Sequence, residues 1–148
     1  MKLVVDANIL FAALIKEGLT AELLISDELN CFAPEFLFDE FSKYEQILLA
    51  KTKRSKTEFT QYMNILKEEI EIIPQKEIMS FIKKAETISP DPKDLVYIAC
   101  ALATNSKIWS NDKKLKEEQE EVKVITTEEL VNKVRIIKKK NKISKGKN

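Results

Sequence analysis

Apolar residues in this sequence gather in short runs that stop at polar or acidic positions. The first run covers residues 3–5 and ends at Asp6. Similar short segments cover 31–33, 71–73, 107–109 and 122–125. Unbroken apolar runs with β-branched residues are typical of strands that are buried on both faces of a parallel sheet. The pattern therefore predicts five short strands, the first of which ends at a carboxylate.

Segments with a helical spacing of apolar residues separate these strands. Pro34 and Pro92 each stand where a first-turn proline of a helix is expected. Thr126 and Glu129 form a capping box for the last helix, which we expect to end near residue 137. Strands that alternate with helices call for a parallel sheet covered on both faces. We therefore expect an α/β fold of three layers, α/β/α, with a central, mostly parallel sheet of about five short strands.

Several acidic residues fall where these elements meet. Asp6 and Asp112 end predicted strands, and Asp94 lies in the first turn of a helix whose residues 95–103 carry no charge. Right-handed crossovers bring the carboxyl ends of parallel strands to one edge, where ligands bind in open α/β sheets. Helix capping is an alternative role for Asp6 and fully accounts for Asp91. At Asp94, a favourable interaction with the helix dipole is a partial alternative.

One further acid is placed by helical periodicity. Residues 34–51 are predicted to form one long helix, and Glu40 falls inside its apolar stripe, whereas Asp39 falls outside it. That stripe comprises Phe36, Leu37, Phe41, Tyr44, Ile47 and Leu48. An inward carboxylate is costly unless it is paired or binds a metal. A salt bridge to a nearby lysine or arginine is the structural alternative for Glu40.

The composition excludes several kinds of chemistry. The chain has no histidine, which removes His-based zinc sites, Ser-His-Asp and Cys-His nucleophiles and paired-His ribonuclease chemistry. Its two cysteines, Cys31 and Cys100, lie in predicted core segments, as expected in a reducing compartment. An enzyme with this sequence must rely on carboxylates, lysines, hydroxyl groups or a bound metal.

Charge is unevenly distributed over the 148 residues. The segment 138–148 holds six lysines and no acid, so the rest of the chain has 19 basic and 24 acidic residues and a net charge of −5. We expect a single domain over 1–137, followed by a basic, disordered tail over 138–148. An acidic body with a basic tail is compatible with nucleic-acid contact. No run approaches the roughly 20 apolar residues of a membrane span, and the amino terminus lacks a signal peptide, so we expect a cytoplasmic protein without a membrane partner.

The acids become informative as a group. Asp6, Glu40, Asp94 and Asp112 would repel one another strongly if all four converged on one edge of the sheet. Such a cluster is stable only when it is protonated or when it binds hard cations, and oxygen ligands of this type suit Mg²⁺ or Mn²⁺. The sequence therefore points to a candidate metal site made of carboxylates.

At this point the chain resembles the PIN-domain ribonucleases, a family that includes the VapC-type toxins of prokaryotic toxin–antitoxin pairs. The resemblance runs from residue 2 to about 137. It rests on Val4-Val5-Asp6-Ala7-Asn8, Glu40, Asp94 with Tyr97-Ile98-Ala99-Cys100-Ala101, and Ile108-Trp109-Ser110-Asn111-Asp112. It implies that Asp6, Glu40, Asp94 and Asp112 are the catalytic acids that hold one or two Mg²⁺ or Mn²⁺ ions. Asn8 and Ser110 would support this site, and Asp91 is an additional acid that could share a ligand role.

The resemblance also implies an activity and partners. A divalent ion would activate water for in-line attack on an RNA phosphodiester bond. Candidate RNA contacts are Lys51, Lys53, Arg54, Lys56, Lys113 and Lys114, each of which could equally be a solvated charge. A toxin of this type would have a small antitoxin protein as its partner. A homodimer is a further candidate assembly, through the apolar face around Phe59, Tyr62 and Met63, which could also be core.

Two other functions fit parts of the sequence. A catalytically inactive PIN-type module that binds RNA or acts as a scaffold would share the fold without needing the four acids. A magnesium phosphatase of the haloacid-dehalogenase type also places an Asp at the end of its first strand. That chemistry requires a second acid two residues later, where this chain has Asn8. The ribonuclease is therefore the function that the sequence favours.

Overall fold

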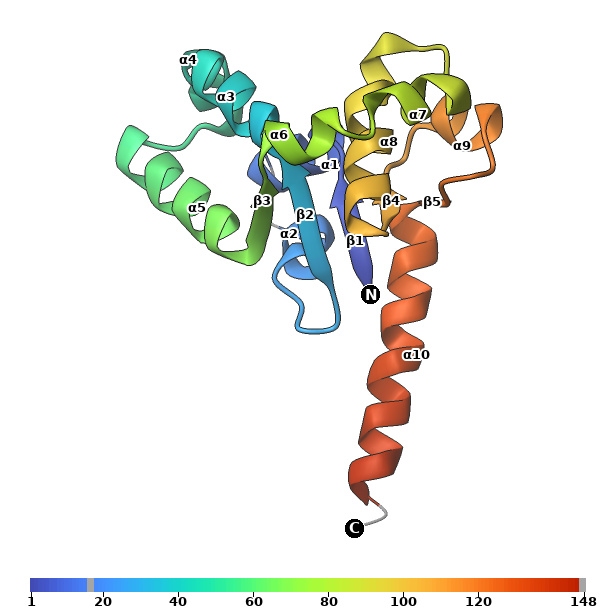
Figure 1. Ribbon diagram of the computed structural model, residues 1–148. Coiled ribbons are helices and arrows are strands. Elements are labelled where there is room, and N and C mark those ends of the chain that lie inside the picture. The colour runs from blue at the N-terminus through green and yellow to red at the C-terminus, as the bar shows by residue number, and fades with distance from the viewer. Residues whose placement is uncertain (16–17, 147–148) are drawn as a thin grey trace.

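Five parallel strands form the centre of the protein. A computed structural model describes residues 1–15 and 18–146. The strands are β1 (Lys2–Val5), β2 (Asn30–Pro34), β3 (Ile70–Ile73), β4 (Lys107–Trp109) and β5 (Val124–Ile125). Their order across the sheet is β3-β2-β1-β4-β5, and every neighbouring pair is parallel (Figure 1). The predicted fold class is confirmed.

Ten helices connect and cover these strands within the described residues. They are α1 (Ala7–Ile15), α2 (Leu19–Leu24), α3 (Glu35–Lys43), α4 (Glu45–Thr52), α5 (Lys56–Glu69), α6 (Gln75–Met79), α7 (Ile82–Ile88), α8 (Pro92–Thr104), α9 (Lys113–Glu118) and α10 (Thr127–Gly146). Pro92 is the first residue of α8, as predicted, whereas Pro34 is the last residue of β2 and precedes α3. No helix in the described part of the chain combines the length and the apolar character that crossing a membrane requires.

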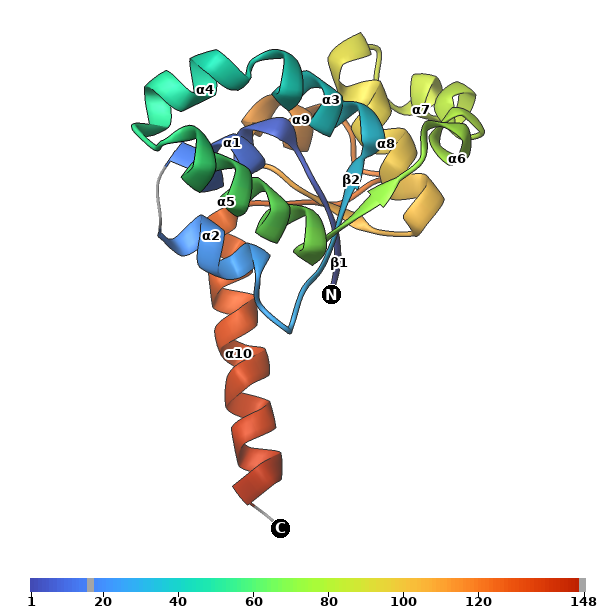
Figure 2. The same cartoon turned by 90° about the vertical axis from the view of Figure 1, so that its left-hand side faces the viewer.

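The sheet separates two hydrophobic clusters, one on each face. Because side chains alternate along a strand, Leu3 and Val5 point into one cluster and Val4 into the other. The first cluster is completed by α1 to α5 and α10, and the second by α6 to α9. Figure 2 shows α1, α2, α4 and α5 gathered on the side that faces the viewer. This arrangement is the three-layer architecture expected from the sequence.

The segment predicted as one helix over 34–51 is divided at Tyr44. The backbone of Tyr44 (φ −103°, ψ 19°) departs from helical geometry, so α3 ends before it and α4 starts after it. Leu48 of α4, which the predicted stripe included, is fully buried in the core. Tyr44 and Ile47, expected in the buried stripe, are instead 52% and 54% exposed. Phe38, which the stripe left out, is buried.

The apolar face proposed for a homodimer belongs to the core of this chain. Phe59 and Met63 are buried in the first cluster. The hydroxyl of Tyr62 donates a hydrogen bond to the carbonyl oxygen of Ala13 at 3.0 Å. Of the two alternatives for this face, the core is the one observed.

The last helix is longer than the sequence analysis expects. We expect it to end near residue 137 and to be followed by a disordered tail, but α10 continues to Gly146. Lysine is a good helix former, and no Gly or Pro interrupts the segment before residue 146. Residues 138–146 are therefore helical, and α10 extends well beyond the rest of the molecule in both views (Figures 1 and 2).

Candidate active site

The candidate site lies at the carboxyl ends of β1 and β4. These neighbouring strands stand where the order of strands reverses, since the chain proceeds from β1 toward β3 and returns across the sheet to β4. Ligands bind at such positions in open α/β sheets. A cavity of about 740 Å³ opens there. Its lining contains five carboxylates: Asp6, Glu40, Asp91, Asp94 and Asp112.

Asp6 is the most deeply buried of the five acids, with 8% of its surface exposed. Its Oδ1 accepts a hydrogen bond from the backbone N–H of Ile9 at 2.9 Å, so Asp6 caps α1. Burial raises the pKa of its carboxyl group, and the charge of Asp112 raises that pKa further, whereas hydrogen bonds from Ser110 and the backbone lower it. Asp6 therefore does cap a helix, the alternative role expected for it, through one carboxylate oxygen. The same residue lines the cavity.

Asp112 combines the same two features at the end of β4. Its Oδ1 accepts hydrogen bonds from the backbone N–H groups of Lys114 at 2.9 Å and Leu115 at 3.4 Å, which caps α9. Its own N–H donates to the hydroxyl of Ser110 at 3.1 Å. Ser110 is fully buried and also hydrogen-bonds Asp6. It therefore links the carboxylate of Asp6 to the backbone of Asp112.

Asp91 has nearly the same local structure at the start of α8. Its N–H donates to the hydroxyl of buried Ser89 at 3.3 Å, and its Oδ1 accepts the N–H of Lys93 at 3.0 Å. The cap expected at Asp91 is present, and the residue also lines the cavity. In both segments a serine is followed by an aspartate two residues later and by a lysine two residues after that, and both lysines, Lys93 and Lys114, line the cavity.

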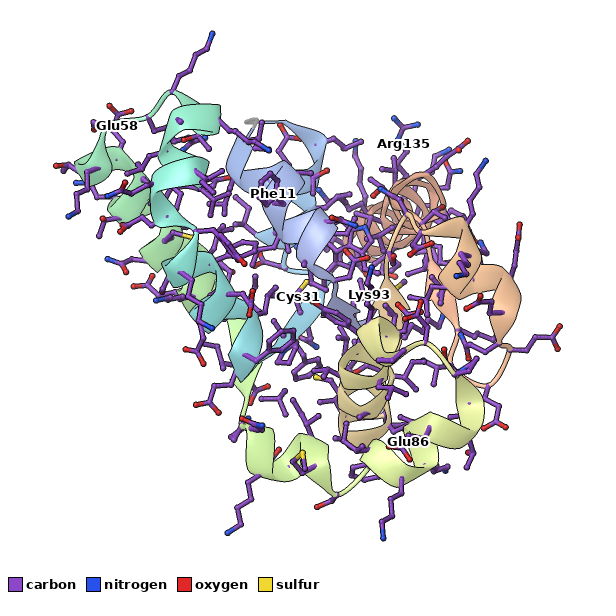
Figure 3. All side chains as sticks on the ribbon, turned by 90° about the horizontal axis from the view of Figure 1, so that it is seen from above. Phe11, Cys31, Glu58, Glu86, Lys93 and Arg135 are labelled. Atoms are coloured by element: carbon purple, nitrogen blue, oxygen red, sulfur yellow. The ribbon has the colours of Figure 1, made fainter. Side chains whose placement is uncertain are left out.

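Lys93 is a cavity residue that the sequence analysis missed. In Figure 3, which views the molecule from above, Lys93 lies near the middle at the start of α8, whereas Glu58, Glu86 and Arg135 lie at the periphery. The repeated Ser-x-Asp-x-Lys pattern was the signal that could have identified it. Asp91 and Asp112 each cap a helix, so Lys93 and Lys114 each occupy the second position of that helix. Both lysines therefore lie beside the same cavity as the capping aspartates.

Glu40 and Asp94 complete the acidic lining from two helices. Glu40 is partly buried on α3 and lines the cavity, whereas its neighbour Asp39 is exposed, as the helical periodicity predicts. The pKa of Asp94 is raised by burial first and then by the charges of Asp91 and Asp112, and Lys114 acts in the opposite direction. Acids from separate segments therefore lie close enough to interact.

Tyr97 reports the combined negative potential. It is buried on α8, and the pKa of its hydroxyl is raised by burial first and then by the negative charges of Asp6 and Glu40, among others. A hydrogen bond with the backbone at Ala7 acts in the opposite direction. Asp6, which follows β1, and Glu40, on α3, therefore both lie close enough to Tyr97 to raise its pKa. Glu40 thus shares one electrostatic environment with the other three predicted acids.

The donor set suits a hard divalent cation. None of the four predicted acids forms an ion pair with a lysine or arginine within residues 1–15 and 18–146. Caps occupy Oδ1 of Asp6 and Asp112, so the other carboxylate oxygen of each has no part in capping. Among the described residues, no three acidic or cysteine side chains already stand in metal-binding positions. The five carboxylates that line the cavity are the groups that would hold an ion there.

The other predicted residues divide between the cavity and distant surfaces. Asn8 and Lys114 line the cavity, whereas Lys51, Lys53, Arg54, Lys56 and Lys113 are not part of its described lining. The Nζ of Lys51 lies 5.5 Å from the ring centre of Phe11, and the guanidinium of Arg54 lies 4.2 Å from that of Tyr62. These two cations cover aromatic rings beside α1 and α5. Of the six candidate RNA contacts, only Lys114 borders the acids.

Comparisons with known proteins agree with this architecture. One chain of the crystal structure of VapBC2 from Rickettsia felis, bound to a DNA fragment from its promoter, superposes with a TM-score of 0.62 at 17% sequence identity. The match covers 85% of the present chain and 98% of that one, and it shows a shared fold. The comparison with curated proteins gives no significant match. The family model described as the PIN domain matches residues 4–133. The chain therefore belongs to the PIN domain family.

Proposed function

We propose that this protein is a Mg²⁺- or Mn²⁺-dependent endoribonuclease. The observation that carries the proposal is the single cavity at the carboxyl edge of the sheet, into which four segments far apart in the sequence bring five carboxylates. Charges of one sign gathered in this way are unfavourable unless a cation or a proton relieves them. The absence of histidine from the chain leaves carboxylate-held metal as the chemistry that fits this lining.

Each part of the lining has a task in such a reaction. Asp6, Glu40, Asp94 and Asp112 would hold one or two ions, with Asp91 as an additional ligand. A metal held there would supply an activated water and charge stabilisation for the leaving oxygen. Ser110 hydrogen-bonds the carboxylate of Asp6 and accepts the backbone N–H of Asp112, which ties the two segments together. Lys93 and Lys114 border the acids and are placed to contact the phosphates of the strand.

Helix ends give the cavity a second attraction for phosphate. The helices α1 and α8 begin there, capped by Asp6 and Asp91. The positive end of a helix dipole favours anions. A site with both carboxylates and helix N-termini can accommodate a metal ion together with the phosphodiester that it acts on.

We further propose that the protein is the toxin of a toxin–antitoxin pair. Support comes from the likeness of its fold to a chain of VapBC2, a complex solved with promoter DNA. A small antitoxin would be the partner, and its reading frame should lie beside that of this chain. Co-expression with the product of the adjacent frame, followed by purification of a stable complex, tests this part. An adjacent frame whose product does not bind would contradict it.

RNA cleavage tests the main proposal. Purified protein should cut a mixed RNA pool when Mg²⁺ or Mn²⁺ is present and should stop when a chelator is added. Asp6→Asn and Glu40→Gln should lose activity by at least the roughly 10- to 100-fold seen when residues around a metal site are changed. Asp39→Asn is the matched control, because Asp39 neighbours Glu40 on the same helix but is exposed outside the cavity.

The outcomes separate the alternatives. RNA binding without cleavage, unaffected by the chelator, would identify an inactive binding or scaffold module. Equal cleavage by wild-type and Asp6→Asn protein would indicate a contaminant or a different site.

A further inference from the structure

The distal part of α10 has no role in holding the domain together. Ile137 is the last residue of this helix that is even partly buried, and residues 138–145 are all exposed. The family match ends at residue 133, so this extension lies beyond the region shared with the PIN domain. Figures 1 and 2 both show it reaching past the chain's N-terminus, away from the edge of the sheet that carries the acids.

Five cations of α10, four of them in this exposed segment, share one face. Arg135, Lys138, Lys139, Lys142 and Lys145 fall within an arc of about 120° when residues are placed 100° apart around the helix. We call these five residues the basic stripe. Lys140 lies on the opposite side, close to the angular positions of Ile136 and Ile143, which are both exposed. The chain has no acidic residue after Glu129.

Few negative charges of the protein offset the repulsion between the cations of the stripe. Each member has another three or four residues away, and a pair of like charges at that spacing destabilises a helix by about 0.2–0.5 kcal/mol. No ion pair involves them in the part of the chain that the structure describes. The pKa of Glu28 is lowered first by its hydrogen bond from Ser26 and only to a smaller extent by the charge of Lys138. The face is therefore suited to a ligand with repeated negative charges.

We propose that the basic stripe is a second RNA-binding surface, separate from the cleavage site, that holds the phosphate backbone of a long substrate. The choice of RNA among polyanions rests on the proposed function. Helix neighbours three or four residues apart have Cβ atoms about 5–6 Å apart, so the stripe offers a row of cations to successive phosphates. Contact of this kind is independent of sequence and is weakened by salt.

The geometry sets a requirement on substrate length. Arg135 lies eight residues and Lys145 eighteen residues after the start of α10, which is about 12 Å and about 27 Å along the helix. At roughly 3.4 Å per stacked nucleotide, a strand that runs from the start of α10 over the whole stripe needs about eight nucleotides. A dinucleotide in the cavity is too short to reach even Arg135.

Binding in the presence of a chelator tests the inference without any cleavage. Fluorescence anisotropy would measure the affinity of a long, labelled oligouridine for the wild-type protein and for a Lys138→Glu/Lys142→Glu variant. We expect the affinity to fall by at least 10-fold. The slope of its salt dependence should fall by about 1.4, because each phosphate that a lysine neutralises on a single strand accounts for roughly 0.7. A single-stranded DNA of matching sequence shows whether the sugar contributes.

A matched pair of single variants provides the control. Lys142→Glu and Lys140→Glu introduce the same charge change two residues apart on opposite sides of one exposed helix. Lys142→Glu should weaken RNA binding clearly more than Lys140→Glu, with equal helix content in circular dichroism. Equal losses would overturn the inference, as would polyglutamate binding as tight as RNA, which would indicate an acidic protein partner.

Kinetics separate this inference from the proposed function. If the protein cleaves RNA, stripe variants should raise KM for long RNA and leave cleavage of a very short oligonucleotide unchanged. Cleavage of long RNA with an unchanged KM and unchanged binding would overturn the stripe alone. RNA binding that depends on the stripe, without metal-dependent cleavage, would overturn the proposed activity alone.

Discussion

The carboxylate of Asp6 is buried, and its burial works against its charge. The pKa of the group is raised above its ordinary value of 3.8, chiefly because burial removes water from the ionised form. The folded protein therefore holds this proton more tightly than the unfolded chain does. Stability consequently falls as the pH rises from 3.8 through the folded pKa, and the ionised group remains unfavourable at neutral pH.

Replacing Asp6 by Asn should therefore stabilise the metal-free protein at neutral pH while it removes activity. Asn is as good an N-cap as Asp, so the hydrogen bond from Ile9 can be kept. Urea unfolding with a chelator present should give a higher free energy of unfolding for the variant at neutral pH. The difference should close at acidic pH, where Asp6 is also neutral. A variant less stable than wild type at neutral pH would contradict this reading of Asp6.

The two cysteines should be inert in the folded protein. Cys31 on β2 and Cys100 on α8 are buried in different hydrophobic clusters, and burial raises the pKa of each thiol to about 12. The reactive thiolate is therefore scarce and shielded at neutral pH. Titration with an aromatic disulfide reagent should show no fast-reacting thiol in native protein and two after denaturation. A native thiol that reacts at the rate of free cysteine would contradict the burial.

At the scale of elements, hydrogen bonds to Thr127 connect β4 and its following loop to α10. The fully buried Trp109 donates from Nε1 to Oγ1 of Thr127 at 3.0 Å, and Asn111 donates to the same oxygen at 3.0 Å. In return, Asn111 accepts the backbone N–H of Thr127 at 2.9 Å. The start of α10 is thereby fixed beside Asp112, which belongs to the candidate site.

Thr127→Val should be markedly destabilising although it preserves the shape of the side chain. The change leaves the indole N–H of Trp109 buried without its acceptor, which costs about 1–3 kcal/mol. Thr60→Val on the exposed face of α5 is a suitable control, expected to change stability by less than about 0.5 kcal/mol. Chemical denaturation of both variants measures the difference. Equal effects would show that the hydrogen bond from Trp109 contributes little.

Elements whose limits are set locally were predictable from the sequence. The strand that ends at Asp6 stops where apolar residues stop, and Asp91 with Pro92 defines the start of α8. Helical periodicity placed Glu40 correctly because Glu40 and its near neighbours lie in α3, before the break at Tyr44. By contrast, nothing in the local sequence marks the break at Tyr44, because it contains neither Gly nor Pro. The break is seen only in the backbone of the folded chain.

Features that depend on several elements together escaped the sequence analysis. Lys93 enters the cavity because α8 and α9 begin side by side, a relation that only the fold provides. The continuation of α10 to Gly146 was not predicted, because a run of lysines is equally typical of an unstructured tail. Lysine charge alone does not distinguish an exposed helix from such a tail, since both are fully solvated.

At the scale of the whole molecule, the five acids meet only when the sheet and its crossovers have formed. The unfolded chain separates them by long stretches of sequence, from Asp6 to Asp112, so it has no comparable site. An ion that binds the folded state alone stabilises it by RT ln(1 + [L]/Kd), about 2.7 kcal/mol at a hundredfold excess over Kd. The proposed metal binding would therefore be coupled to folding.

Thermal unfolding tests this coupling directly. For a chain of this size about 2.7 kcal/mol corresponds to a rise in Tm of roughly 5–10 °C, which Mg²⁺ or Mn²⁺ should produce in the wild-type protein. Asp6→Asn should lose most of that rise despite its higher stability without metal, whereas Asp39→Asn should keep it. Sodium chloride at matched ionic strength should have little effect, because it screens surface charges without placing a divalent ion among the carboxylates. An equal rise in wild type and Asp6→Asn, or one reproduced by sodium chloride, would mean that the ions act on the surface rather than on the carboxylates at the edge of the sheet.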